Sequence, residues 1–153
     1  MAKVANHYFK VDPFCIVEEG FNPEYSLTAE AVFSLGNEYM GVRGYFEEGY
    51  SGARLLGSYF NGVYERREAE AQGYKGIAKE TEFMVNALDW LYLRIYAGEE
   101  KLDLEEADFR DFKRTLDMKT GLLSREFIWK TNLGEIAIKM ERLISMVHNE
   151  EAG

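Results

Sequence analysis

The stretch FSLGNEYMGVRGYFEEG (residues 33–49) places four glycines, one arginine and two adjacent glutamates within seventeen residues. Glycine permits positive φ angles and close backbone approach, and the aromatic and apolar residues between the glycines supply surface to bury. Arg43 can make a two-pronged bond to a carboxylate, and Glu47 and Glu48 follow it closely. We therefore predict a tightly turned strand packed against another surface, with the Glu47–Glu48 pair held in structural ion pairs.

The second half of the chain alternates apolar and polar residues with a period of two, which is typical of β-strands. Strands are predicted at residues 90–96, 122–130, 135–141 and 143–147, and either a strand or a short helix-like turn at 109–118. Turns are predicted at AGEEK (97–101) and KTG (119–121), and TNLG (131–134) is typical of a hairpin turn.

The first half is less regular. A short strand is predicted at residues 14–18, whereas residues 26–34 fit either a helix, which Ser26 would cap, or a strand. Residues 53–64 predict a bulged strand or two short strands, and the charged residues 65–82 predict an exposed excursion. Many short strands with little helix indicate an all-β fold, an antiparallel β-sandwich in a single domain over residues 1–153.

The composition excludes several classes of function. A net charge of −9 without a Lys/Arg run disfavours binding to nucleic acid or to an anionic membrane surface. Cys15 is the only cysteine and is predicted to be a small buried hydrophobe. Because we find no signal peptide and no long apolar run, we expect a cytosolic protein without a membrane span.

No catalytic or metal-binding constellation is recognisable. His7 and His148 lie at opposite ends of the chain, so we expect neither a metal site nor a nucleophile triad. Adjacent carboxylates occur in several places, but neighbouring side chains in strands point in different directions. Only Glu47–Glu48 stands out, and even there we expect an ion pair rather than catalysis.

Aromatic residues reach 14% of the chain, and flat rings suit both core packing and sugar stacking. If the chain were a free-standing carbohydrate-binding module, sugars would stack on Trp90, Tyr92 or Trp129. This module is one alternative that the sequence leaves open.

Several spaced motifs together resemble the beginning of glycoside hydrolase family 65. They are FSLGNEYMGVRGYFEEG, YFNGVYE, NALDWLYLRIYAGEEKLDLEE, RTLDMKTGLLSREFIWKT and the final ER, and together they span roughly residues 8–148. The family includes maltose, kojibiose, nigerose and trehalose phosphorylases. One position departs from the family pattern, because Glu38 stands where glycine is common.

The resemblance implies a large N-terminal β-sandwich of the super-sandwich, galactose-mutarotase-like type, followed by a catalytic (α/α)6 barrel and a small β domain. Since the sequence stops at Gly153, we expect a partial sandwich without the barrel. No catalytic residue of the family can be carried over. The residues that match the scaffold motif are Gly36, Asn37, Tyr39, Gly41, Arg43, Gly44, Glu47 and Glu48. Of these, we expect Asn37, Tyr39, Arg43, Glu47 and Glu48 to form a wall facing another domain or the substrate.

The implied activity belongs to the intact enzyme, and we do not expect the fragment to be active alone. It is the inverting, reversible phosphorolysis of an α-glucosidic disaccharide, with inorganic phosphate as co-substrate and no cofactor. The implied partners are the chain's own barrel, the disaccharide and a second subunit of a homodimer. The N-terminal part of a family 65 hydrolase, such as a trehalase, is a further alternative.

Overall fold

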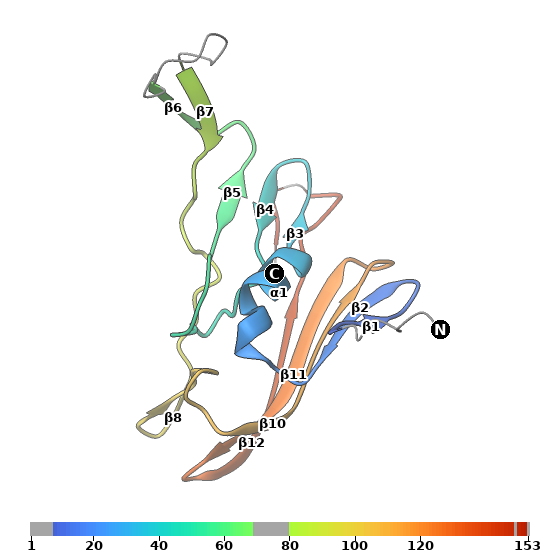
Figure 1. The fold of residues 1–153 in the computed structure, drawn as a ribbon, viewed down its shortest axis with the longest axis vertical. Coiled ribbons are helices and arrows are strands. Elements are labelled where there is room, and N and C mark those ends of the chain that lie inside the picture. The colour runs from blue at the N-terminus through green and yellow to red at the C-terminus, as the bar shows by residue number, and fades with distance from the viewer. Residues whose placement is uncertain (1–7, 69–79, 149, 153) are drawn as a thin grey trace, which may run out of the picture.

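The computed structural model describes residues 8–68, 80–148 and 150–152, which form antiparallel sheets with one short α-helix (Figure 1). The largest sheet has five strands in the order β1-β2-β10-β11-β12, and each pair is antiparallel. Their bounds are Lys10–Val11, Cys15–Glu19, Phe109–Asp117, Leu122–Thr131 and Gly134–Arg142. The expected all-β, antiparallel class is confirmed.

Three smaller sheets lie beside the large one. β3, β4 and β5 form one, while β6–β7 and β8–β9 form two-stranded pairs. In order, these strands span Leu35–Gly36, Met40–Val42, Ser58–Phe60, Tyr64–Glu68, Glu80–Met84, Tyr96–Ala97 and Glu100–Lys101. The β6–β7 pair projects from one end of the molecule, away from the five-stranded sheet (Figure 1).

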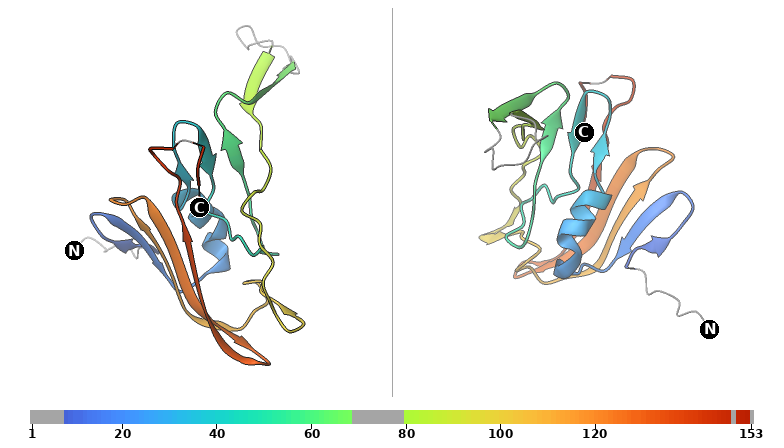
Figure 2. Two further views of the ribbon diagram at one scale, coloured as in Figure 1. Left: turned by 180° about the vertical axis from the view of Figure 1, so that it is seen from behind. Right: turned by 45° about the horizontal axis from the view of Figure 1, so that its top comes forward.

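A 3-10 turn, η1 (Pro23–Tyr25), leads into helix α1 (Ser26–Val32), which decides the choice left open for residues 26–34. Buried residues recur at helical spacing, since Ser26, Ala29, Glu30 and Phe33 all face the interior. Ser26 does not cap the helix, because its Oγ donates to Ala53 O at 2.8 Å. The helix lies over one face of the five-stranded sheet (Figure 2). Along the ranges described, no helix has the length and apolar character to cross a membrane.

Strands β11 and β12 form where the alternation predicts them, and β10 shows that residues 109–117 are a strand, which decides the choice left open for 109–118. On β11 the side chains of Leu123, Phe127 and Trp129 are buried, whereas Glu126 and Lys130 are exposed. TNLG makes the predicted hairpin turn, because Thr131 pairs with Gly134, whose φ is +122°. Alternation along a strand therefore identified the inner face of this sheet.

Four local predictions are corrected. Only the last residue of the strand predicted at 90–96 lies in a strand, β8, because the rest has no ladder partner among the described residues. Residues 143–147 form no strand, and Ile144 makes only a single bridge, to Ala152. The excursion at 65–82 is exposed but contains β6 and β7, and residues 69–79 lie outside the described part. Cys15 is half-buried rather than buried.

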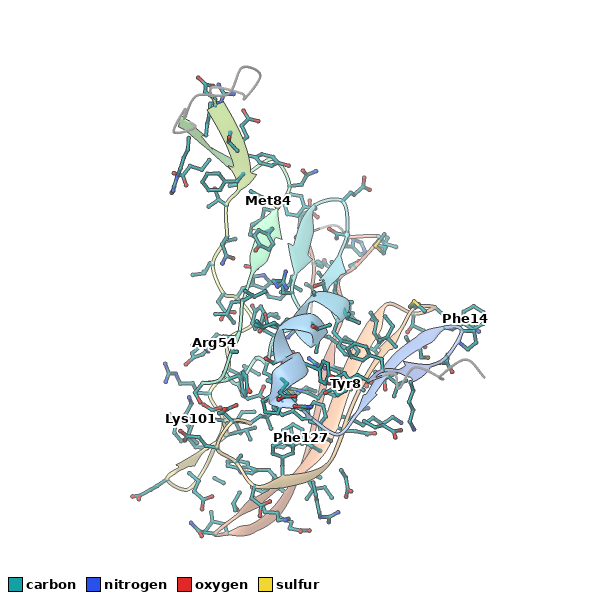
Figure 3. All side chains as sticks on the ribbon, viewed as in Figure 1. Tyr8, Phe14, Arg54, Met84, Lys101 and Phe127 are labelled. Carbon is teal, nitrogen blue, oxygen red and sulfur yellow. The ribbon has the colours of Figure 1, made fainter. Side chains whose placement is uncertain are left out.

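The main core lies between the inner face of the large sheet and the segments that cross it. Its buried members are Phe46, Tyr50, Ala97, Leu102, Leu104, Phe112, Phe127 and Trp129. The rings pack mainly edge to face, as Phe46 does against Tyr50 at 5.6 Å between centroids. In Figure 3, Phe127 lies on this inner side, whereas Phe14 lies at the outer tip of the β1–β2 pair.

Two glycines of the 33–49 stretch are required, each for a different reason. Gly49 has a φ of +86°, which favours glycine. At Gly44 a Cβ atom would lie 2.6 Å from Phe33 Cβ and 2.8 Å from the Phe33 backbone, so no side chain fits. At Gly41 the nearest atom would be Leu35 O at 3.8 Å, an ordinary contact.

We therefore predict that Gly44→Ala lowers the free energy of unfolding by about 3 kcal/mol, because the added methyl group overlaps backbone atoms that cannot move independently. Chemical denaturation followed by circular dichroism measures the change. Gly41→Ala is the matched control and should change stability by less than about 1 kcal/mol. Equal effects of the two substitutions would show that the close approach at Gly44 is unimportant.

Candidate functional site

Three arginines lie on the inner face of neighbouring strands, directly beneath residues 43–48. Arg114 on β10 is directly opposite Arg125 on β11, and Arg142 on β12 pairs with Leu123, two residues along β11 from Arg125. Their exposed fractions are only 2–4%. We call these arginines, together with Glu18, Glu47 and Glu48, the arginine cluster.

Arg125 joins both motif glutamates to the sheet. Its Nη2 lies 2.5 Å from Glu48 Oε2 and 3.0 Å from Glu47 Oε2. The Glu48 side chain is fully buried, so Arg125 is the cation that neutralises it. The structural ion pair expected for Glu47–Glu48 is present, and its partners are sheet arginines.

Arg142 binds the same segment at two kinds of acceptor, the Glu47 carboxylate and backbone carbonyl groups. Its Nε donates to Glu47 Oε1 at 2.9 Å, and its Nη2 also contacts that oxygen. Nη1 donates to Arg43 O at 2.9 Å and Nη2 to Tyr45 O at 2.8 Å. One guanidinium therefore binds three alternate residues of the segment, Arg43, Tyr45 and Glu47.

Arg114 completes the row. Its Nε donates to Glu18 Oε2 at 2.8 Å and its Nη1 to Gly44 O at 2.9 Å. The Phe46 ring contacts two guanidinium groups, with Arg114 Cζ 5.1 Å and Arg125 Cζ 4.4 Å from its centroid. The three arginines face three carboxylates, so the cluster is balanced in charge.

Arg43 does not make the two-pronged bond that we predicted. Its Nε lies 3.7 Å from Glu30 Oε2, too far for a hydrogen bond. Glu30 Oε2 instead accepts from the backbone N–H groups of Leu55 and Leu56, at 2.9 and 3.2 Å. The Arg43 side chain is thus near a carboxylate without binding it in bidentate fashion.

The other motif residues lie at the far end of the stretch. Asn37 Oδ1 accepts from the N–H groups of Tyr39 and Met40 at 2.8 Å, and its Nδ2 donates to Ser145 O at 2.8 Å. These bonds shape the β3–β4 turn. Glu38 is exposed and does not adopt a positive φ, so glutamate is accommodated there without strain.

The sugar-stacking candidates fall in three different environments. Trp129 is 2% exposed and packs in the core, so its ring offers no face to a sugar and this prediction is wrong. Tyr92 is 43% exposed, with the Arg94 guanidinium 4.9 Å from its ring centroid. Trp90 lines an open groove of about 300 Å³ whose other lining residues are Tyr39, Met40, Phe60, Glu150 and Ala152.

Burial changes the acid–base behaviour of the cluster. Burial by itself would raise the pKa of the Glu47 carboxyl, but the charges of Arg125 and Arg142 outweigh it, so the pKa lies below its ordinary value of 4.5. Glu47 is therefore a stable carboxylate at neutral pH rather than a proton donor. No group of three potential metal ligands occurs within the part of the chain that the structure describes.

Sequence reasoning missed the three arginines and Glu18. One signal was available, because Ile136, Ile138 and Met140 share a face of β12 and the next residue of that series is Arg142. An arginine that continues an apolar face indicates a buried guanidinium.

Residues 16–153, which include the whole arginine cluster, match the family description "Glycosyl hydrolase family 65, N-terminal domain". The chain belongs to glycosyl hydrolase family 65. The resemblance inferred from the motifs is confirmed.

Several curated relatives are named as phosphorylases, and others as uncharacterized glycosyl hydrolases. The chain is 32% identical to an α,α-trehalose phosphorylase of Thermoanaerobacter brockii and 34% identical to the maltose phosphorylase of Bacillus subtilis, over 94% and 93% of its length. A solved structure of a candidate kojibiose phosphorylase from the human microbiome is 44% identical over 98% of this chain, with a TM-score of 0.89. The chain spans 19% of each curated relative and 20% of that structure, so the similarity concerns about a fifth of those proteins.

Because folding lowers the pKa of Glu47, its contribution to stability is present above pH 4.5 and is lost as the pH falls through the lower folded-state value. We predict that Glu47→Gln destabilises the chain most at pH 7, and that its difference from the unmodified chain shrinks below about pH 4.5. Urea denaturation at pH 3 to 7 measures this. Glu141→Gln, which breaks an exposed pair with Lys139, is the control and should have little effect throughout. A Glu47→Gln effect that does not change with pH would contradict the assignment.

Proposed function

We propose that this chain serves as the N-terminal, non-catalytic domain of a family 65 phosphorylase and supports its catalytic barrel. In that enzyme, inorganic phosphate attacks the anomeric carbon of an α-glucosidic disaccharide such as maltose, kojibiose or trehalose, on the side opposite the leaving sugar. One carboxylic acid of the barrel protonates the leaving oxygen, and the configuration is inverted. Phosphate takes the place of the activated water of inverting hydrolases, so one protein carboxyl is sufficient.

The burial of the motif carboxylates carries this proposal. A general acid must come within hydrogen-bond reach of the leaving oxygen. Glu48 is fully buried, the Glu47 side chain is 13% exposed, and both are bound by Arg125. These two residues therefore support the domain, and catalysis is assigned to another part of a longer polypeptide. The phosphorylase names of the relatives support the reaction class.

The same proposal includes a cytosolic location and a homodimeric enzyme, with the disaccharide and the barrel as partners. The single cysteine is compatible with a reducing compartment, since no internal disulfide can form.

We predict that the isolated chain releases no glucose 1-phosphate from maltose and phosphate. A chimera in which it replaces the matching fifth of the Bacillus subtilis maltose phosphorylase should retain phosphorolysis, because the catalytic residues come from the remaining polypeptide. Coupled detection of glucose 1-phosphate measures both. Turnover by the isolated chain, or a folded chimera without phosphorolysis, would contradict the proposal.

Carbohydrate binding is a second candidate role, favoured by the groove that contains Tyr39, Phe60 and Trp90. Calorimetric titration of the folded chain with maltose, kojibiose and trehalose tests it, with Trp90→Ala as the matched variant. Binding that Trp90→Ala abolishes would support this role, and absence of binding at millimolar sugar would exclude it.

A further inference from the structure

An extended segment along one edge of the molecule is only half paired. Residues 88–95 connect the projecting β6–β7 pair to β8 and run along the outside of the molecule (Figure 1). The alternating pattern of residues 90–96 predicts a strand, yet only Tyr96 belongs to a ladder. Nearby backbone bonds run from Ala87 N to Ser58 O at 2.7 Å, from Leu93 N to Glu47 O at 2.8 Å, and from Leu102 N to Ile95 O at 2.9 Å.

From Leu93 onward the bonded residues share one parity. Leu93 and Ile95 are bonded, and Ala97 continues the series as the partner of Glu100 in the β8–β9 pair. In an extended chain the N–H and C=O of one residue point to the same edge, and neighbouring residues point to opposite edges. The backbone groups of Tyr92 and Arg94 therefore point outward. Within the described ranges, these two residues make no backbone hydrogen bond.

The side chains beside this edge are also uncovered. Tyr92 is 43% exposed, Leu93 50% and Tyr96 53%. Arg94 is exposed and has no carboxylate within ion-pair distance among the described residues, although its guanidinium lies over the Tyr92 ring. Unpaired backbone groups flanked by apolar side chains form a template for an additional strand. We call residues 92–96 the open edge.

We propose that the open edge pairs with a β-strand of the polypeptide that follows this domain in the full-length enzyme. This inference rests on the proposed function, because the chain spans only about a fifth of the relatives that it matches. The strand offers backbone partners to Tyr92 and Arg94, an acidic side chain to the Arg94 guanidinium, and an apolar side chain to Leu93.

A second copy of the chain fits this edge less well. Each copy carries a net charge of −9, so copies repel one another. Pairing two copies antiparallel about residue 94 would place Arg94 opposite Arg94, and like charges directly opposite destabilise a strand pair. The acidic partner that Arg94 needs comes more readily from a different segment.

Residue-resolved amide exchange tests the inference. The 153-residue chain is compared with a chimera in which it is followed by the polypeptide that follows the matching segment in the human-microbiome protein. We expect the amides of Tyr92 and Arg94 to exchange at least about 100-fold more slowly in the chimera, because they become ladder donors. The amide of Leu93, which is bonded already, should be protected in both.

A proline substitution gives a second readout. Arg94→Pro removes the outward N–H group, whereas Arg94→Ala removes only the side chain, and an extended residue tolerates proline when its N–H is unpaired. In the chimera, Arg94→Pro should lower the melting temperature more than Arg94→Ala, and in the 153-residue chain the two should be alike.

Three outcomes would overturn the inference. The first is equal amide exchange rates of Tyr92 and Arg94 in the two proteins, and the second is an equal change of melting temperature for the two Arg94 substitutions in the chimera. The third is amide protection that appears in the 153-residue chain as its concentration rises, which would identify a second copy as the partner. Phosphorolysis by the chimera is measured separately. An active chimera with unprotected amides overturns this inference alone, and an inactive chimera with protected amides supports it while contradicting the proposed function.

Discussion

The burial of three guanidinium groups beneath residues 43–48 is the constraint on which the rest of the structure depends. A buried charge is costly unless it is paired and its donors are bonded. The segment supplies Arg114, Arg125 and Arg142 with two carboxylates and with the carbonyl groups of Arg43, Gly44 and Tyr45. Among the described residues, only Nη1 of Arg125 is a buried donor of these three guanidinium groups without a hydrogen-bond partner. Glu18, on a neighbouring strand, supplies the third carboxylate. If residues 43–48 were shifted along the sheet, further guanidinium donors would lose their partners. The arginine cluster therefore specifies one position of this segment on the sheet.

Other parts of the fold follow from that position. With the segment held on the sheet, Gly44 lies against Phe33 at the end of α1, where no side chain can be accommodated. Gly44 N also donates to Glu30 O at 2.8 Å, which ties the helix to the segment. Phe46 enters the main core in contact with two arginines, and Leu93 N donates to Glu47 O. The segment that carries the family motif thus connects helix α1, the five-stranded sheet and the chain around Leu93, which agrees with a supporting rather than a catalytic role.

Local patterns predicted the parts of the fold that depend on near neighbours. β11 and β12 follow from alternation and from a two-residue turn, both of which are short-range properties. Alternation also shows which face a residue occupies, so the burial of Trp129 follows from its shared parity with Phe127. It does not show which distant segment covers that face, and for this reason Arg43 was expected to pair with a carboxylate that Arg142 and Arg125 bind instead. The strand predicted at residues 90–96 has the pattern of a strand but lacks a partner within the described residues, because pairing depends on a second segment.

The coupling between Glu48 and Arg125 tests the central claim most directly. A double-mutant cycle compares the unfolding free energies of the unmodified chain, Glu48→Gln, Arg125→Met and the double variant. If the pair fixes the segment on the sheet, each single change leaves a buried group unpaired and lowers the free energy of unfolding by about 3–5 kcal/mol. The double change should lower it by less than the sum of the two single effects, with a difference of at least about 1.5 kcal/mol. Additive effects, with a coupling energy near zero, would contradict the account.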